Sequence, residues 1–187
     1  MLEKLPAAVG RALRRVRPGV DRLTCRSSVV RSALPVIEVT SPAFGDQQPI
    51  PARFTADGER ISPPLAWSGV PDGTRSIALL VEDADSPTLS PLVHAIAWHV
   101  DPAVRQLAEG DLAPGDHHPS LGINSFLRHG WLPPDPPPGH GPHRYGFQVF
   151  ALDHDPELGV LPGRSTLVRA LRGHTLACGL LIGTYER

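Results

Sequence analysis

The sequence predicts a mostly β protein: an antiparallel β-sandwich with a short C-terminal helix and an added basic, amphipathic N-terminal helix. Short segments rich in β-branched residues recur along the chain, with glycine and proline between them. No helical crossover repeats between these segments, as a doubly wound parallel sheet would require. The chain has 187 residues, the size of one domain, and can bury about 70% of its unfolded surface without a disulfide or metal.

Residues 1–34 are expected to form a basic extension of a domain at 35–187. Residues 1–31 carry eight basic and two acidic side chains, a net charge of +6, and the remainder carries ten and seventeen, a net charge of −7. Apolar residues at helical spacing predict one face of a helix that Pro18-Gly19 should end, formed by Leu2, Leu5, Val9, Ala12, Leu13 and Val16. Such a helix can contact an anionic membrane or a partner, or pack on its own domain; the alternative is a partly disordered tail.

Six segments of the domain have the alternation or the apolar, β-branched character of strands: Pro35–Thr40, Ile50–Thr55, Arg75–Val81, Leu92–Val100, Arg144–Leu152 and Cys178–Tyr185. Residues 101–142 are too proline-rich for regular structure and predict a long loop, which would be functional or disordered. One helix is expected over Thr166–Arg172, with Ser165 as its N-cap and with Leu167, Ala170 and Leu171 facing inward.

Composition excludes several classes of protein. Glycine and proline number 18 and 22 of the 187 residues. Together they make up about 21% of the chain, short of the roughly 25–30% that is typical of low-complexity chains. No apolar run approaches the roughly 18 residues that span a bilayer. Lys4 is the only lysine, so the domain has no Schiff-base chemistry.

Cys25 and Cys178 lack metal-ligand spacing, and arginines interrupt any secretory signal, so we expect reduced thiols and a cytoplasmic protein. Cys25 is expected to be exposed and Cys178 to be buried.

Asp83-Ala84-Asp85-Ser86-Pro87 directly follows an expected strand. Two carboxylates two residues apart in a turn can aim outward from the end of a sheet, although an ordinary Asx turn gives the same pattern. His94 lies within an apolar strand, where a buried imidazole needs a partner because an unsatisfied polar group costs about 1–3 kcal/mol. Taken alone, the position of His94 favours a satisfied core histidine over a binding residue.

A stiff run of prolines, residues 136–142, leads into the strand that begins near Arg144. Prolines fix the shape of this loop, and its glycines permit close approach of the backbone to a ligand. Because side chains alternate along a strand, His143 and Tyr145 should share one face and Arg144 the other.

Together these segments resemble the phosphatidylethanolamine-binding protein family, in its bacterial Raf-kinase-inhibitor-like branch. The resemblance covers residues 35 to 187 and consists of Asp57-Gly58, Ile61-Ser62-Pro63-Pro64-Leu65, Trp67, Val70-Pro71, the turn at 83–87, His94, Asn124, Phe126, the run 136–145, Gly183-Thr184-Tyr185 and Arg187.

The resemblance implies a β-sandwich with one small cavity for phosphate-like anions and with no metal or organic cofactor. The matching polar positions are Asp83, His94 and His143; the matching lining positions are Tyr145, Pro87 and Pro137; and the matching supporting positions are Asp85, Arg144 and Trp67. The expected ligand is a phosphorylated small molecule or a lipid headgroup. The family pattern is broken at Ala84, Ser86, Ala95 and Pro133, and we expect these changes to reshape the cavity.

Two imidazoles can donate hydrogen bonds to a phosphate, and Asp83 could orient a histidine or hold an ammonium group. Phosphate affinity should therefore weaken between about pH 6 and 8. The alternative is a metal-assisted phosphoester hydrolase that uses Asp83, His94 and His143, with further ligands from His117, His118 and His140. No motif of a known hydrolase supports this alternative.

The resemblance also implies inhibition of a kinase or a protease, with a protein partner at the rim of the cavity. Trp131 could anchor such a partner or pack under its own loop. A homodimer through a face of the sandwich is also plausible. Nucleic acid is not expected, because the domain carries no basic stripe.

Overall fold

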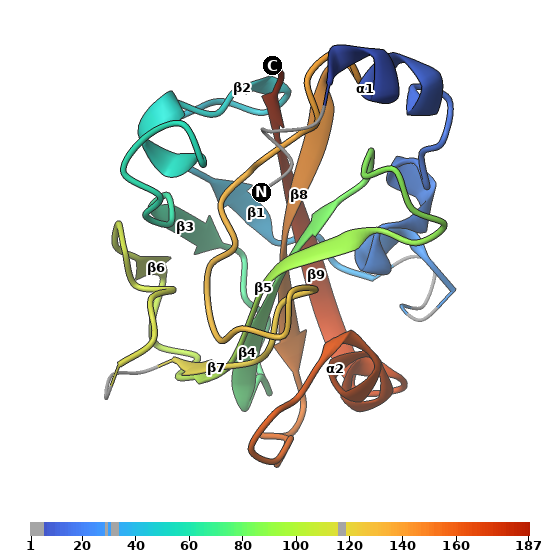
Figure 1. The fold of residues 1–187 in the computed structure, drawn as a ribbon. Coiled ribbons are helices and arrows are strands. Elements are labelled where there is room, and N and C mark those ends of the chain that lie inside the picture. Colours follow the sequence, from blue (N-terminus) through green and yellow to red (C-terminus); the bar gives the residue numbers. More distant parts are fainter. Residues whose placement is uncertain (1–5, 29, 31–33, 116–118) are drawn as a thin grey trace.

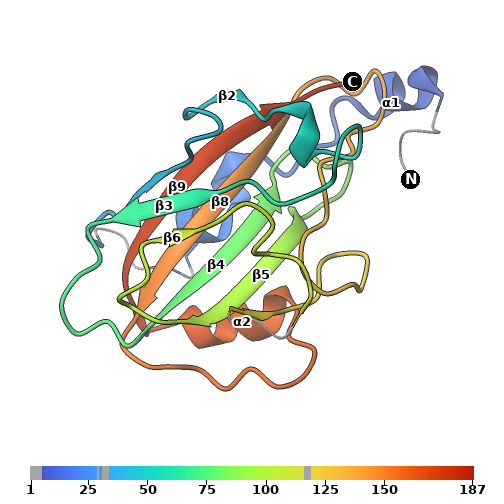
Figure 2. The same ribbon diagram turned by 90° about the vertical axis from the view of Figure 1, so that its left-hand side faces the viewer.

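The computed structural model describes residues 6–28, 30, 34–115 and 119–187. It contains a six-stranded sheet, the central sheet, of order β2-β9-β8-β4-β5-β7, and a three-stranded sheet of order β1-β3-β6 (Figures 1 and 2). The strands are β1 (Glu38–Thr40), β2 (Gln48–Pro49), β3 (Leu65–Ser68), β4 (Ser76–Asp83), β5 (Leu92–Val100), β6 (Gln106–Leu107), β7 (Ser120–Leu121), β8 (His143–Leu152) and β9 (Thr175–Tyr185). The helices are α1 (Ala7–Leu13), α2 (Arg164–Leu171) and the 3-10 turns Val20–Arg22, Thr24–Arg26 and Ala52–Phe54.

Strand β4 lies inside the central sheet, and every one of its residues is buried. Its side chains alternate between two cores. Leu79 and Val81 pack in the core shared with the three-stranded sheet, and Ala78 and Leu80 pack in the core shared with α2. A strand covered on both faces needs apolar residues at successive positions, which explains the run Ile77–Val81.

The central sheet is mixed rather than purely antiparallel, which corrects the sequence prediction. Strand β2 pairs with β9 in parallel, and Val36 forms a parallel bridge with Cys178. The expected strand Ile50–Thr55 is also wrong. The backbone N–H of Ile50 still bonds to Thr184, but Pro51 then starts a 3-10 turn in which Phe54 donates to the carbonyl of Pro51. Proline has no N–H for a strand ladder, which explains this break.

Helix α2 begins two residues before its expected start. Its N-cap is therefore Gly163, and Ser165 makes no capping hydrogen bond. Leu167 and Leu171 are buried as expected, whereas Ala170 is half-buried.

The N-terminal segment, residues 6–28, packs against the domain. Helix α1 ends at Leu13, five residues before Pro18, and two of the predicted apolar positions, Leu2 and Leu5, lie outside the described residues. Gly10 is its buried residue, whereas Val9 and Val16 of the predicted apolar face are exposed. The helix therefore docks through a small residue rather than through the predicted apolar face. No helix in the described part of the chain is long and apolar enough to cross a membrane.

The two cysteines are free thiols, and both are half-buried. They pack at the edge of the core that contains α2. Burial raises the pKa of the Cys25 thiol to about 12, so the expectation of an exposed, accessible Cys25 was wrong.

Candidate functional site

Three predicted segments meet at one end of the central sheet. Strand β4 runs antiparallel to both β5 and β8, so its last residue lies beside the first residues of its neighbours. Asp83 pairs with Leu92 on one side and with Tyr145 on the other. This register brings the turn after β4, His94 of β5 and His143 of β8 together. Figure 1 shows α1 at the same end of the molecule as the C-terminus, and α2 at the opposite end.

The carboxylate of Asp83 has two partners. Its Oδ1 accepts a 2.8 Å hydrogen bond from the backbone N–H of Asp85, so the turn is the Asx turn that the sequence allowed. Its Oδ2 lies 2.7 Å from Nδ1 of His143. The same side chain thus closes the turn and orients a histidine.

The two ring nitrogens of His143 are both in hydrogen bonds. Nε2 of His143 lies 2.7 Å from Nδ1 of His140, and Nε2 of His140 lies 3.0 Å from the carbonyl oxygen of Leu13. The chain of contacts therefore runs from Asp83 through two imidazoles to the backbone of the N-terminal segment.

The protons in this chain can be counted. The Asp83 carboxylate and the Leu13 carbonyl both accept, so the three hydrogen bonds need three protons, and two neutral imidazoles supply only two. Arg17 also points a nitrogen at Nδ1 of His140, 3.4 Å away, which makes that atom an acceptor. Burial, followed by the charges of His143 and Arg17, lowers the pKa of His140. All three contacts are hydrogen bonds at once only when one imidazole carries both of its protons, and the Arg17 contact favours His143 for that role.

His94 has the opposite protonation state. Its Nδ1 lies 2.6 Å from the carbonyl of Leu132 and donates to it, whereas its Nε2 is buried and has no hydrogen-bond partner among the described residues. Burial lowers the pKa of His94 despite the nearby charge of Asp83. His94 is thus a neutral imidazole that offers a bare, acceptor nitrogen. The rings of His94 and Tyr145 pack edge to face, with their centroids 5.0 Å apart.

A small cavity of about 20 Å³ lies between these groups. It is lined by Asp83, Ser86, Pro87, Leu92, His94, Phe126, Leu132, Pro133, Asp135, Pro136 and His143. One water needs about 10–15 Å³ of such space, so the cavity has room for only about one water molecule in this conformation. A groove of about 640 Å³ lies beside it and shares Phe126, Leu132, Pro133 and Asp135 with its lining.

Asp85 anchors the start of β8, because it binds Arg144, the residue that follows His143. Its fully buried carboxylate accepts two 2.7 Å hydrogen bonds from the guanidinium of Arg144 and one of 2.9 Å from the Arg144 backbone. Arg17 adds an ion pair at 3.2 Å. Burial alone would raise the pKa of Asp85, but the hydrogen bonds from Arg144 hold it below its usual value.

Four of the predicted lining and polar residues contact the cavity: Asp83, His94, His143 and Pro87. Tyr145 lies behind the histidines rather than in the lining; burial raises its pKa well above the usual value. Pro137 accepts a backbone hydrogen bond from His140, and its neighbours Asp135 and Pro136 line the cavity instead. Trp67 lies in β3 within the main core and does not contact the cavity.

Sequence reasoning missed Asp135, Leu132 and the contacts of the N-terminal segment. Asp135 is the one acid within the run Pro133–Pro138, a signal that could have identified it. Arg187 forms an ion pair with Asp135 and a second with Asp57. Trp131 packs under its own loop, stacked on Phe147 at 6.1 Å, with its indole N–H toward Phe54.

The geometry gives no support to a metal at this cavity. In the part of the chain that the structure describes, the ligand atoms of Asp83, His94 and His143 do not form one of the compact groups that could hold an ion. Both nitrogens of His143 are engaged, and so are both nitrogens of His140, with His143 and with the carbonyl of Leu13. His117 and His118 lie outside the described residues.

Comparisons with known proteins agree with the geometry. The family model described as phosphatidylethanolamine-binding protein matches residues 40–186. A UPF0098 protein of Pyrococcus horikoshii is 39% identical over 151 residues, 79% of this chain and 75% of that protein. A UPF0098 protein of Chlamydia muridarum is 38% identical over 157 residues, 81% of this chain and 99% of that protein.

Two solved structures share the fold. A structure described as a putative phosphatidylethanolamine-binding protein homologue of Chlamydia trachomatis superposes with a TM-score of 0.75 at 35% identity, covering 82% of this chain and 99% of that one. Escherichia coli YbcL, described as a member of the mammalian family, gives a TM-score of 0.75 at 28% identity and covers 81% and 98%. The family match begins at residue 40, so α1 and Arg17 lie outside it.

Proposed function

The chain belongs to the phosphatidylethanolamine-binding protein family, and we propose that it is a non-catalytic binding and regulatory protein whose cavity takes the phosphate group of a small molecule or headgroup. One observation carries the proposal: Nε2 of His94 is buried at the cavity with no hydrogen-bond partner among the described residues, beside the Asp83–His143 pair. An unsatisfied buried polar atom costs about 1–3 kcal/mol, so a ligand that bonds to it binds favourably.

The protonation states select the form of the phosphate. A bare nitrogen accepts, so His94 suits a ligand that donates a hydrogen bond. A phosphate monoester loses its second proton near pH 6, and below that pH it keeps one P–O–H group that can donate to His94. A doubly protonated His143 would place positive charge beside the other phosphate oxygens. A monoanionic phosphate therefore fits better than a dianion, which Asp83 and Asp135 would repel.

The size of the cavity requires movement of its lining. A phosphate group is larger than the single water that about 20 Å³ accommodates. Phe126, Leu132 and Pro133 separate the cavity from the groove of about 640 Å³. Displacing these side chains would join the two spaces, with the phosphate against His94 and the rest of the ligand in the groove near Arg60 and Arg128.

The regulatory output would pass through a protein partner at the rim, in the manner of a kinase or protease inhibitor. Phe126 and Leu127 support this part of the proposal, because both are large, exposed apolar residues beside the cavity. Exposed aromatic groups at a rim are common anchors in interfaces. A ligand that displaces Phe126 would change the same surface.

Calorimetric titration with phosphoethanolamine, inorganic phosphate and ethanolamine at pH 6.0 and pH 8.0 tests the proposal. We expect saturable binding of the two phosphates, weaker at pH 8.0, and a loss of at least about 10-fold in His94→Phe, which preserves shape and removes the acceptor. His99→Phe, at the opposite end of β5, is the matched control. Equal affinity at both pH values, or unchanged binding in His94→Phe, would overturn the proposal. Binding of ethanolamine alone would assign the cavity to the ammonium group instead.

A further inference from the structure

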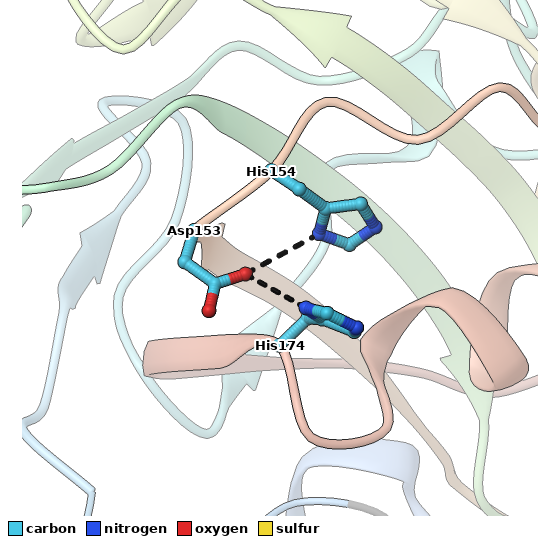
Figure 3. Close-up of side chains that lie close together, drawn as sticks. All are labelled: Asp153, His154 and His174. Carbon is cyan, nitrogen blue, oxygen red and sulfur yellow. Dashed lines mark hydrogen bonds and ion pairs between the residues drawn. The ribbon is translucent and has the colours of Figure 1, made fainter.

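A second group of polar side chains lies at the other end of the central sheet. Asp153 and His154 directly follow β8, and His174 directly precedes β9. The backbone N–H of Asp153 bonds to the carbonyl of His174 at 3.1 Å, which holds the two strand ends together. Figure 3 shows one carboxylate oxygen of Asp153 facing a nitrogen of each imidazole ring.

The ligand atoms of this group lie close enough together to share one metal ion. Oδ1 of Asp153 lies 2.9 Å from Nδ1 of His174 and 3.5 Å from Nδ1 of His154. One ligand atom from each residue lies within 4.8 Å of the others. A tetrahedral zinc ion with bonds of about 2.0–2.1 Å separates its ligand atoms by about 3.3 Å. Small rotations of the side chains would therefore place all three ligands around one ion.

His154 supplies a second observation. Its Nδ1 is buried and makes no hydrogen bond within the described ranges, since 3.5 Å exceeds the usual N–H···O distance. The backbone around it is fixed, because the hydroxyl of Ser76 donates a 2.7 Å hydrogen bond to the carbonyl of His154. The ring of His174 lies close, with centroids 4.2 Å apart. A hydrogen-bonded Asp153–His174 pair alone explains neither the orientation of His154 nor its unsatisfied nitrogen.

We propose that Asp153, His154 and His174 bind one transition-metal ion of the zinc class. Two imidazoles and one carboxylate suit first-row ions such as Zn²⁺ rather than Mg²⁺ or Ca²⁺, which prefer oxygen ligands. Three protein ligands leave a fourth tetrahedral position for water or an exogenous group. All three side chains are partly exposed, so an ion can reach them from solvent.

The ion would join the two ends of the connection that contains α2. Asp153 and His154 precede residues 155–173, and His174 follows them. An ion bound to the folded chain and not to the unfolded one stabilises the fold by mass action. Zinc binding would therefore raise the melting temperature and reduce opening of the α2 connection.

The test is calorimetric titration of the untagged, chelator-treated full chain with ZnCl₂. We expect one ion per chain, with affinity reduced by at least about 10-fold in His174→Ala and in His154→Ala. Three controls should retain binding: His129→Ala removes an exposed imidazole elsewhere, His99→Ala removes the imidazole that pairs with Asp155, the residue after His154, and Cys25→Ser tests the thiol. Melting temperatures without metal check that the variants fold.

A second readout uses Co²⁺, whose visible absorption is intense in tetrahedral nitrogen and oxygen sites and weak in water. We expect this absorption in the wild-type chain and its loss in His174→Ala. Absence of zinc binding would overturn the proposal. Binding that survives in both His174→Ala and His154→Ala, or that is lost equally in His129→Ala, would do the same and would assign the heat to an adventitious ion only.

Discussion

Nε2 of His143 lies 2.7 Å from Nδ1 of His140, and this contact connects the cavity to the N-terminal segment. His140 in turn meets the carbonyl of Leu13. Arg17 reaches the same loop, because its guanidinium donates to the carbonyls of Pro142 and His140. A segment outside the family match thus contacts the histidine pair at the cavity.

The first prediction concerns the protonation state of His143. At neutral pH, ¹⁵N NMR of the imidazole rings should show both nitrogens of His143 protonated and Nδ1 of His140 unprotonated, because the three hydrogen bonds need three protons. In His140→Ala the Nε2 proton of His143 loses its acceptor, and the fraction of imidazolium should fall. A neutral His143 in the wild-type chain would contradict the proton count.

The second prediction concerns Gly10, which faces the proline loop. A Cβ atom at this position would lie 2.1 Å from the carbonyl oxygen of Pro138. Alanine normally stabilises a helix by about 1 kcal/mol relative to glycine, but here it would push α1 off the loop. Gly10→Ala should therefore destabilise the protein and increase hydrogen exchange at residues 136–143. Ala8→Gly, at an exposed position of the same helix, should lower stability by at most about 1 kcal/mol and leave exchange in the loop unchanged.

The third prediction concerns Arg17. Its loss removes hydrogen bonds to two loop carbonyls and an ion pair with the buried Asp85. Arg144 still pairs with Asp85, so the carboxylate keeps a cation. We expect Arg17→Ala to lower the free energy of unfolding by about 1–3 kcal/mol in urea titration. The exposed Arg15→Ala should change it by less than about 0.5 kcal/mol; equal effects of the two variants would contradict the docking of the segment.

The fourth prediction concerns Glu82, whose buried carboxylate faces the core that contains α2. It accepts from the backbone of Thr24 at 2.9 Å, from Gln148 at 2.8 Å and from Arg164 at 2.5 Å. Removing Arg164 leaves a buried negative charge with neutral donors only, which costs about 3–5 kcal/mol for a fully buried pair. Because Arg164 is partly exposed, Arg164→Ala should cost less, about 2 kcal/mol. Arg169→Ala, on the exposed face of α2, is the control in the same unfolding experiment.

The sequence predicted the central strands well, because their apolar and β-branched runs reflect local alternation and burial. It predicted Asp83, His94 and His143 as neighbours because the family motif orders them along the chain. It failed at residues 50–55, where Pro51 overrides the apolar pattern. The contacts of Arg17 and Leu13 with His140 join residues more than 120 positions apart. Such contacts depend on tertiary packing, which local periodicity does not encode.

The last prediction concerns the dependence of stability on pH. The folded state lowers the pKa of both His94 and His140, chiefly through burial. In the unfolded chain these histidines titrate near 6.5. Below that pH the unfolded state therefore binds more protons than the folded state. Stability should therefore fall as the pH decreases from about 7 to 5, by up to about 1.4 kcal/mol per pH unit for each histidine.

The pKa of Asp85 is shifted in the same direction, but its effect on stability falls in a more acidic pH window. Its pKa is lowered in the folded state, so its contribution is present above its usual pKa of 3.8 and is lost only at more acidic pH. The loss between pH 7 and 5 thus belongs to the histidines. Urea unfolding of the wild-type chain and of His94→Phe at pH 7, 6 and 5 measures it. The free energy of unfolding of His94→Phe should depend less steeply on pH than that of the wild-type chain. His129→Phe, which replaces an exposed histidine, should have the same pH dependence as the wild-type chain. A slope in His94→Phe equal to that of the wild-type chain would show that folding leaves the pKa of His94 unchanged, which would contradict the assignment of a neutral, acceptor imidazole at the cavity.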